Sequence, residues 1–463
     1  MRTRAIVIGS GPGGYHCAIR LRQRGVETVV VERDIIGGTC LNRGCIPAKA
    51  LLTASEVAES LPFWKKAGLR VEYQGVDLPS LQSWKRSIVE RLDRGIAFLF
   101  KNNGVQYLEG EARLKDAHTV EVRTPEGAKT VEADYIVIAT GSKPVELKGF
   151  PVDGERIVVS DQALEWEEVP KSLLVVGAGA VGLELGAVYQ RFGSQVTVVE
   201  MMPQILPGMD AESAHLLTRS LIRKGMQIHT GMVLADLETR GDGFEALLRA
   251  TEGDREERVQ ISHVLIAVGR RPVLPEGAAE LLSPDERGYL QPDAHQRTRI
   301  PHIFAIGDCA RPPLLAHKAF MEGLVAAHNI AGEESIYEPQ AVPAVIYTDP
   351  ELASVGKTEE ELKKEGIPYQ VGKFPYTASG RALTMGKTEG QVKVLVDEEG
   401  QLLGVHAVGP LASEIIGEAG LALEMSASLE DLLLTVHAHP TLHEALREAC
   451  ESVRREAIHI LNR

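Results

Sequence analysis

The 463-residue sequence predicts an α/β protein with two parallel-sheet domains and a C-terminal α+β domain. Three observations predict this architecture. First, a glycine-rich segment follows a short apolar run at two places in the chain. Second, each copy leads into an apolar helical pattern. Third, strand patterns followed by apolar helices begin after about residue 340. The chain is also too long for one hydrophobic core and is typical of three or four domains.

The repeated segment consists of a strand, a glycine turn, a helix, a second strand and a terminal acid. One copy ends at Glu32 and the other at Glu200, with the same spacing from turn to acid. Such a turn lets backbone N–H groups and a helix N-terminus bind a pyrophosphate. The glycines expected to form the turns are Gly9, Gly11 and Gly14, and in the second copy Gly177, Gly179 and Gly182. The sequence therefore predicts two Rossmann-like dinucleotide-binding domains.

The terminal acids, Glu32 and Glu200, are expected to accept hydrogen bonds from a ribose diol. A carboxylate at Glu200 would repel a ribose 2′-phosphate, and no arginine follows it nearby, so NAD is favoured over NADP. The alternative is a solvated acid that merely ends a strand. Because two nucleotides with the same role would be redundant, we expect one flavin dinucleotide, FAD, and one NAD.

Later apolar runs indicate the domain boundaries. Each domain has a further strand that reaches a glycine, at Gly141 and at Gly269. The run at 303–308 is best placed back in the first domain, which makes the second domain an insertion. The expected segments are an FAD-binding domain, an NAD-binding domain, a return to the FAD domain and a C-terminal interface domain, at residues 1–147, 148–271, 272–338 and 339–463.

The last helical pattern carries an apolar stripe of Leu442, Leu446, Ala449 and Val453. We interpret this stripe as a face that packs into the core. A subunit interface is the alternative.

The net charge of −14 argues against binding to nucleic acid or to an anionic membrane surface. No apolar run is long enough to span a membrane, and no leader pattern opens the chain, so a cytoplasmic location is expected. Five cysteines are too few for a secreted disulfide scaffold.

Only Cys40 and Cys45 lie close together in the sequence. Five residues of regular helix rise about 7.5 Å, beyond the Cα separation of about 7 Å that a disulfide tolerates. A bond between them therefore needs irregular backbone, which Gly44 and Pro47 permit. Unpaired buried thiols, a structural bridge and half of a zinc site are the alternatives. Zinc would need two further ligands, and a redox-active disulfide facing a flavin is the favoured interpretation.

Several segments occur in the order found in the pyridine nucleotide-disulfide oxidoreductase family, which the chain resembles over essentially its whole length. They are GSGPGGYHCAIR, GGTCLNRGCIPAK, the ATG at 139–141, the AIGD at 305–308, VIYTDPELASVG and HAHPTLHEA. Within the family, the chain is most similar to the class I members that oxidise dihydrolipoyl groups with FAD and NAD⁺. A glutathione-reductase-like enzyme that uses NADPH is the alternative, and Glu200 speaks against it.

The resemblance implies a homodimer in which the C-terminal segment reaches the disulfide of the other subunit. It also implies a small-molecule dithiol substrate and a protein partner. That partner would be the lipoyl-bearing acyltransferase core of a 2-oxo acid dehydrogenase complex, or a glycine-cleavage carrier protein.

The resemblance further implies roles for residues near the cysteine pair. Cys40 would be the interchange thiol that meets the substrate, and Cys45 the thiol that contacts the flavin. Lys49 would lie beside the reactive flavin nitrogen, paired with Glu184. Without the resemblance, these last two residues would be interpreted as surface helix charges.

Other positions match the family's cofactor contacts. Asp308 would bind the sugar chain of the flavin. Contacts to the two cofactors are also implied at Thr140, Gly141 and Gly269.

His439 and Glu444 match the family's base and its orienting carboxylate. A thiol with an ordinary pKa of about 8.5 is mostly protonated at neutral pH, and only the thiolate attacks a disulfide. A histidine titrates in the useful range, and a carboxylate on its far nitrogen fixes the tautomer. His437 and His443 are rivals that spacing does not exclude, but Pro440 directly after His439 favours His439.

Two residues depart from the family pattern. Arg43 lies between the cysteines where an apolar residue is common, and Ala48 replaces a common serine. Arg43 would either lower the pKa of a nearby thiol or tune the flavin potential, or it would point into solvent.

Overall fold

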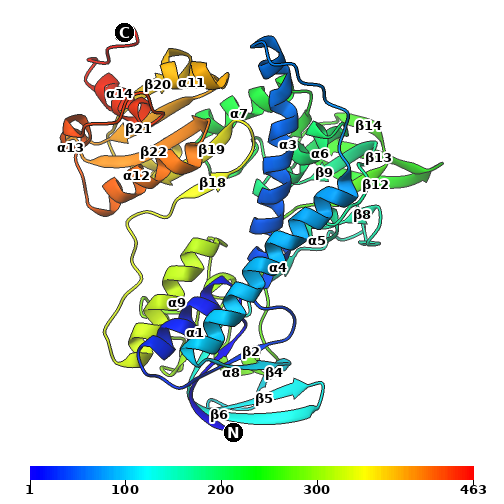
Figure 1. The fold of residues 1–463 in the computed structure, drawn as a ribbon, viewed down its shortest axis with the longest axis vertical. Coiled ribbons are helices and arrows are strands. Elements are labelled where there is room, and N and C mark those ends of the chain that lie inside the picture. The colour runs from blue at the N-terminus through cyan, green and yellow to red at the C-terminus, as the bar shows by residue number, and fades with distance from the viewer. Residues whose placement is uncertain (463) are drawn as a thin grey trace. The chain divides into compact units, whose positions relative to one another are not determined.

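The structure is a computed structural model that describes residues 1–462 and divides into two compact units (Figure 1). Unit 1 contains residues 1–50, 79–145 and 269–338, and unit 2 contains residues 51–78, 146–268 and the chain from 339 onward. The division into four domain segments stays a prediction, because these units do not separate the expected NAD-binding and interface segments.

Unit 1 is built on a seven-stranded sheet in the order β3-β2-β1-β6-β5-β4, with β17 paired to β6. Its strands, together with the separate antiparallel pair β7 and β16, are β1 (Arg2–Ile8), β2 (Thr28–Glu32), β3 (Gln106–Glu109), β4 (Glu111–Leu114), β5 (Thr119–Thr124), β6 (Gly127–Ile138), β7 (Ser142–Pro144), β16 (Arg270–Pro272) and β17 (Ile303–Ala305). The strands β1, β2, β3, β17 and the end of β6 run parallel, whereas β4 and β5 form antiparallel pairs. The expected return of residues 303–308 to the first sheet is therefore observed as strand β17.

Helices cover both faces of this sheet, and each face has its own apolar core. The helices are α1 (Pro12–Gln23), α2 (Gly38–Arg43), the start of α3 (Cys45–Lys66), α4 (Leu78–Asn103), α8 (Ala278–Leu282), the 3₁₀ turn η1 (Gly307–Cys309) and α9 (Ala316–Ala331). Figure 1 shows α1 and α9 side by side. A Cβ added to Gly323 would lie 2.5 Å from the carbonyl oxygen of Gly13, so the two helices pack with their backbones close together.

Unit 2 contains two five-stranded sheets, ordered β11-β10-β9-β15-β8 and β18-β19-β22-β21-β20, and a three-stranded antiparallel sheet of β12, β13 and β14. The strands are β8 (Ile157–Val158), β9 (Ser172–Val176), β10 (Gln195–Glu200), β11 (Gln227–Thr230), β12 (Met232–Arg240), β13 (Gly243–Ala250), β14 (Glu256–Ile261), β15 (His263–Ile266), β18 (Ala344–Ile346), β19 (Glu351–Gly356), β20 (Gln370–Pro375), β21 (Gln391–Val396) and β22 (Leu402–Gly409). The first sheet is parallel, like the centre of unit 1, and the last is antiparallel.

The helices of unit 2, besides the remainder of α3, are α5 (Ser160–Ala163), α6 (Ala180–Arg191), α7 (Ala211–Arg223), α10 (Glu359–Glu365), η2 (Tyr376–Ala378), α11 (Gly380–Met385), α12 (Ala412–Glu424), α13 (Leu429–Leu434) and α14 (Glu444–Val453). In the terminal stripe, Leu442, Leu446 and Ala449 are buried in the core of the C-terminal sheet, and Val453 packs against it. The interpretation of this stripe as a core face is confirmed, and so is the predicted fold class of two Rossmann-like sheets with a C-terminal α+β region.

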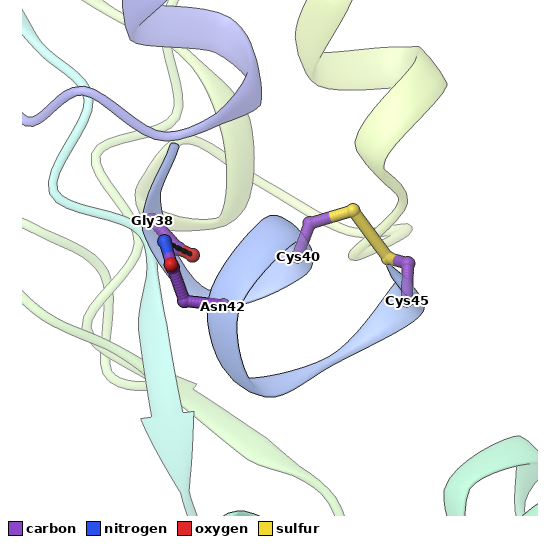
Figure 2. The surroundings of a disulfide bond; sticks show 4 residues. All are labelled: Gly38, Cys40, Asn42 and Cys45. Carbon is purple, nitrogen blue, oxygen red and sulfur yellow. Dashed lines mark hydrogen bonds between the residues drawn. A yellow bond between two sulfur atoms is a disulfide. The ribbon is translucent and has the colours of Figure 1, made fainter. Parts of the chain in front are cut away.

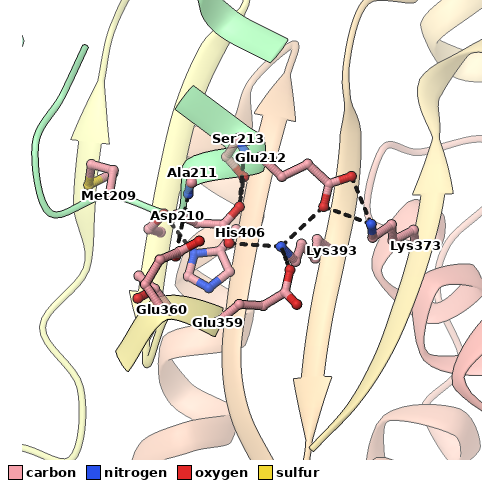
Figure 3. Close-up of polar contacts among 12 residues, drawn as sticks. Met209, Asp210, Ala211, Glu212, Ser213, Glu359, Glu360, Lys373, Lys393 and His406 are labelled. Carbon is pink, nitrogen blue, oxygen red and sulfur yellow. Dashed lines mark hydrogen bonds and ion pairs between the residues drawn. The ribbon is translucent and has the colours of Figure 1, made fainter. Parts of the chain in front are cut away.

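A buried charge cluster joins α7 to the C-terminal sheet within unit 2 (Figure 3). The Lys393 ammonium lies 2.8 Å from Asp210 and 3.1 Å from Glu212, and it also bonds to Glu359. The side chains of Lys393 and Asp210 are 0% exposed. Asp210 also caps α7 by accepting the N–H of Ser213 at 2.9 Å.

Among residues 1–462, no helix combines the length and the apolar character that crossing a bilayer requires.

Candidate active site

Cys40 and Cys45 form a disulfide, with their Cα atoms 4.7 Å apart (Figure 2). Helix α2 ends at Arg43, Gly44 adopts a non-helical conformation, and α3 begins at Cys45. This break is the irregularity that the spacing predicted, because a continuous helix would hold the cysteines too far apart. Both cysteines are half-buried, so the bond is neither sealed in the core nor fully in water.

The turn before the disulfide is fixed by Asn42. Its side-chain amide donates to the carbonyl oxygens of Ile36 at 2.8 Å and Gly38 at 3.0 Å, and Figure 2 shows the second bond. Gly37 and Gly38 have φ angles of +91° and +63°, which glycine adopts without strain. The sequence GGTCLN therefore builds a rigid support for Cys40.

Arg43 forms an ion pair with Asp34, and both side chains are nearly half exposed. The guanidinium is therefore partly neutralised and remains in contact with solvent. None of the expectations for Arg43 included this partner.

The other three cysteines, Cys17, Cys309 and Cys450, are buried and unpaired. Burial raises the pKa of Cys309 to about 11 and that of Cys450 to about 12, and it also raises the pKa of Cys17. Because only a thiolate is reactive, these three thiols are inert at neutral pH. Among the cysteines, only the bonded pair is suited to redox chemistry.

The first glycine turn leaves space only where a ligand would need it. A Cβ on Gly9 would lie 2.4 Å from the Ala139 carbonyl oxygen, and one on Gly14 would lie 2.0 Å from the Gly9 carbonyl oxygen. Gly11, which caps the N-terminus of α1, has nothing within 4 Å of that position. Two glycines thus close the turn, and the third keeps the helix N-terminus open to a pyrophosphate.

The second turn repeats this arrangement. A Cβ on Gly177 would lie 2.5 Å from the Ala267 carbonyl oxygen, one on Gly182 would lie 2.2 Å from that of Gly177, and Gly179 at the N-cap of α6 is again open. The repetition extends to the conformation, since Gly9 has a φ of +102° and Gly177 a φ of +101°.

Each terminal acid is bonded back to its own glycine turn. Glu32 accepts the N–H and the hydroxyl of Ser10, both at 2.8 Å, and Glu200 accepts the N–H of Ala178 at 2.8 Å. Both side chains are buried. These bonds fix the carboxylates beside the turns, and Oε1 of Glu32 and both carboxylate oxygens of Glu200 each retain a further lone pair for a ribose hydroxyl.

Asp308 lies in η1, directly after strand β17. Its Oδ2 accepts the hydroxyl of Ser142 at 2.5 Å, and the guanidinium of Arg270 donates to that hydroxyl oxygen at 2.8 Å. Thr140 donates to the carbonyl oxygen of Val273 at 2.5 Å. The expected cofactor residues Thr140, Gly141, Gly269 and Asp308 all lie in unit 1 with the first glycine turn.

His439 and Glu444 form a hydrogen-bonded pair in unit 2, with Nδ1 and Oε1 2.8 Å apart. The second carboxylate oxygen accepts the N–H of Thr441 at 2.8 Å. Burial alone would raise the pKa of Glu444, but the bonds from His439 and Thr441 hold it below its ordinary value. The His439 side chain is 79% exposed, so Nε2 is presented outward on this unit.

The two rival histidines are engaged by a different carboxylate. Glu418 on α12 lies 2.7 Å from Nε2 of His437 and 2.7 Å from Nδ1 of His443. This arrangement leaves His439 as the histidine with its own orienting carboxylate and an outward nitrogen. Spacing alone did not make that distinction, because Glu418 lies about 20 residues earlier in the chain.

Lys49 and Glu184 belong to different units, so their pairing stays a prediction. Glu184 is buried in α6 and accepts the N–H of Tyr347 at 3.0 Å.

The residues present fit two dinucleotides. Each glycine cradle is open at its N-cap and would be filled by a Cβ, and each has a buried carboxylate fixed at its side. These features are the donor and acceptor set that a pyrophosphate and an adenosine ribose require.

A family model described as pyridine nucleotide-disulphide oxidoreductase matches residues 3–323, and a model of the dimerisation domain matches residues 342–450. The chain belongs to the pyridine nucleotide-disulphide oxidoreductase family. It is 50% identical to the dihydrolipoyl dehydrogenase of Thermus scotoductus, with 99% of both chains covered. It is 42% identical to that of Haloferax volcanii, over 100% of this chain and 98% of the relative.

Among solved structures, LpdA from Mycobacterium tuberculosis has a TM-score of 0.89 and 27% identity, with 97% of this chain and 99% of that chain covered. The predicted membership of the pyridine nucleotide-disulphide oxidoreductases is therefore confirmed, and relatives in this family use FAD and NAD.

Several residues that shape the site were not identified from the sequence. Ser142 and Arg270 hold Asp308, Asp34 holds Arg43, and Glu418 holds the two rival histidines. Only Ser142 carried a local signal, since it directly follows the ATG segment.

Proposed function

We propose that the chain is a dihydrolipoyl dehydrogenase, which oxidises dihydrolipoyl groups to the cyclic disulfide and reduces NAD⁺. The observation that carries this proposal is the half-buried Cys40–Cys45 disulfide in the same unit as a glycine turn open to a dinucleotide. The full-length relatives of the same name support it.

The catalytic sequence begins with proton transfer to Nε2 of His439, the nitrogen opposite its bond to Glu444. The resulting substrate thiolate attacks the sulfur of Cys40, and the sulfur of Cys45 leaves as a thiolate. The second substrate thiol then loses its proton to solvent and attacks the substrate sulfur of the mixed disulfide, which releases the oxidised substrate and the Cys40 thiolate. The two cysteines thereby gain the electron pair that the dithiol loses.

FAD would be held by the first glycine turn with Glu32, Thr140, Gly141 and Asp308, and Lys49 would lie near its reactive ring nitrogen. NAD⁺ would be held by the second glycine turn together with Glu200. The bound flavin supplies the chemistry that converts the electron pair of the cysteines into a hydride for NAD⁺.

A homodimer completes the site in this proposal, with His439 of one subunit serving the disulfide of the other. Support comes from the dimerisation domain and from the exposed apolar side chains before His439. Val436 is 94% exposed and Leu434 is 72% exposed, and in a dimer of this kind the partner subunit would cover these side chains.

The proposed protein partner is the lipoyl-bearing acyltransferase core of a 2-oxo acid dehydrogenase complex, in the cytoplasm. The net charge of −14 suits a basic docking module, and binding should then weaken as the salt concentration rises. Association that is independent of salt would contradict this electrostatic docking.

The decisive experiment compares the reduction of NAD⁺ and NADP⁺ by dihydrolipoamide, by glutathione and without thiol. We expect turnover only with dihydrolipoamide, and faster with NAD⁺. Cys40→Ser should abolish it, whereas Cys450→Ala, which removes a buried unpaired thiol, should retain it. Turnover of Cys40→Ser with dihydrolipoamide, or glutathione-dependent turnover with the NADP couple, would overturn the proposal.

A further inference from the structure

One buried ion pair on α9 holds both backbone polar groups of Gly307, the residue before Asp308. The N–H of Gly307 donates to Oε2 of Glu322 at 2.7 Å, and its carbonyl oxygen accepts from Nζ of Lys318 at 3.4 Å. Nζ of Lys318 also lies 2.9 Å from Oε1 of Glu322. The two side chains are 2% and 0% exposed, so both charges converge on one residue inside unit 1.

An ion pair this deeply buried is expected to contribute little net stability to the fold. Removing two charges from water costs about as much as their attraction returns, and an apolar pair of similar volume often packs equally well. What the charges provide here is two directed bonds to the same residue. Gly307 has a φ of +73°, a left-handed conformation that glycine permits but does not enforce. Its orientation is fixed by these two bonds together with the N–H of Ala310, which donates to the same carbonyl oxygen at 3.0 Å.

The turn that Gly307 begins leads directly to Asp308. The carboxylate of Asp308 is held from one side by Ser142. The backbone that carries it is held from the other side by Lys318 and Glu322 through Gly307. Lys318 also donates to the carbonyl oxygen of Arg311 at 2.8 Å, so the ammonium holds the turn on both sides of Asp308.

We propose that Lys318 and Glu322 are positioning residues for flavin binding, which fix the backbone of Gly307 so that Asp308 meets the sugar chain of FAD. This inference rests on the proposed function, since it takes FAD as the ligand of unit 1. The pair contributes no atom to the redox chemistry and acts through the Gly307–Asp308 turn.

The test measures FAD affinity directly. Apoprotein of the wild type, Glu322→Leu and Glu322→Gln is titrated with FAD, and the dissociation constant is read from the flavin fluorescence. Glu322→Leu leaves the buried Gly307 N–H without its acceptor and the Lys318 ammonium without its counter-charge, and we expect at least tenfold weaker binding. Glu322→Gln keeps an oxygen for the N–H, and we expect a smaller loss.

A double variant separates positioning from stability. Lys318→Met/Glu322→Leu removes both charges and refills the space with apolar side chains, so the thermal stability of the apoprotein should recover toward that of the wild type. FAD affinity should not recover, because the Gly307 N–H still lacks its acceptor and the carbonyl oxygen keeps only the Ala310 N–H. If the pair were purely structural, FAD affinity and thermal stability would both recover in the double variant.

The matched control is Lys393→Met in unit 2, which removes an equally buried ammonium from Asp210. It should lower the unfolding temperature and leave FAD affinity within twofold of the wild type.

FAD affinity that recovers in the double variant, or that falls equally in Lys393→Met, would overturn the positioning role. If Glu322→Leu does not fold, the other two variants still test the positioning role. Wild-type FAD affinity in both Glu322→Gln and the double variant would overturn it. Failure of the wild type itself to bind FAD would instead refute the proposed function.

Discussion

Nδ1 of His439 and Oε1 of Glu444 lie 2.8 Å apart, and the other carboxylate oxygen of Glu444 is held by the N–H of Thr441. Glu444 begins α14, whose apolar face is buried, so the carboxylate is anchored to a rigid element. The pair thus gives an exposed histidine a fixed ring orientation, with Nε2 directed outward.

Replacing His439 should remove the proton acceptor for the substrate thiol. His439→Gln should slow dihydrolipoamide oxidation by about 10²- to 10⁴-fold, the range of a general base. NADH oxidation by an artificial electron acceptor that bypasses the cysteines should be unchanged. Stopped-flow measurement of both half-reactions checks this, and wild-type dihydrolipoamide turnover in the variant would reject the assignment.

Glu418 should affect kcat indirectly, because it holds the segment of chain that carries His439. Glu418→Gln weakens its bonds to His437 and His443, which flank His439, and should reduce kcat by about tenfold, which is about 1.4 kcal/mol. Glu448→Gln is the matched control, because Glu448 bonds His459 at 2.6 Å outside this segment. Equal losses in the two variants would show that only general stability is affected.

Alanine substitutions at two glycines of the second turn should have different effects. Gly179→Ala places its Cβ in open space, so the protein should fold and keep its flavin while the KM for NAD⁺ rises at least tenfold. Gly182→Ala, whose Cβ would lie 2.2 Å from the Gly177 carbonyl oxygen, should instead reduce the unfolding temperature. Unchanged NAD⁺ kinetics in Gly179→Ala would show that the second turn does not bind the nucleotide.

Glu200 should set the preference between NAD⁺ and NADP⁺. Glu200→Ala removes both the ribose acceptor and the repulsion of a 2′-phosphate, so kcat/KM should fall by about tenfold for NAD⁺ and fall less or rise for NADP⁺. The ratio of the two kcat/KM values is the readout. A ratio equal to that of the wild type would remove Glu200 from the specificity argument.

The Lys393 cluster should contribute to stability in a pH-dependent way (Figure 3). Burial alone would raise the pKa of Asp210, but His406, Lys393 and Ser213 hold it below its ordinary value. When folding lowers the pKa of a carboxylate, the resulting stabilisation is fully present above the pKa of the unfolded state, which is about 4. It is lost as the pH falls through the lower pKa of the folded state. The difference in unfolding temperature between the wild type and Lys393→Met should therefore be constant at about pH 5–7 and shrink below about pH 4. A difference that does not change with pH would exclude the ion pairs as its cause.

The repeated glycine turns and terminal acids were predictable because their geometry is local. The sequence separation that places Ser10 against Glu32 recurs between Ala178 and Glu200, and a strand, a turn and a helix suffice to bring each pair together. The redox pair was predictable for the same reason, since Gly44 breaks the helix between its cysteines.

What the sequence did not predict depends on contacts between distant segments. The antiparallel strands β12 to β14 carry no motif, and helix α4 and most of helix α3 lie between the recognised segments. The choice among three histidines depended on Glu418, and the support of Asp308 depended on Ser142 and on a lysine–glutamate pair in α9. Each of these partners is an ordinary polar residue until the fold brings it to the site.

The most direct test of the central claim is a count of reactive thiols before and after reduction by substrate. The purified yellow protein is mixed anaerobically with one equivalent of dihydrolipoamide, without NAD⁺, alkylated and digested for mass spectrometry. We predict no label on Cys40 or Cys45 before reduction and label on both afterwards, with Cys17, Cys309 and Cys450 unlabelled throughout. A colourless protein, or cysteines that dihydrolipoamide leaves bonded, would contradict the account.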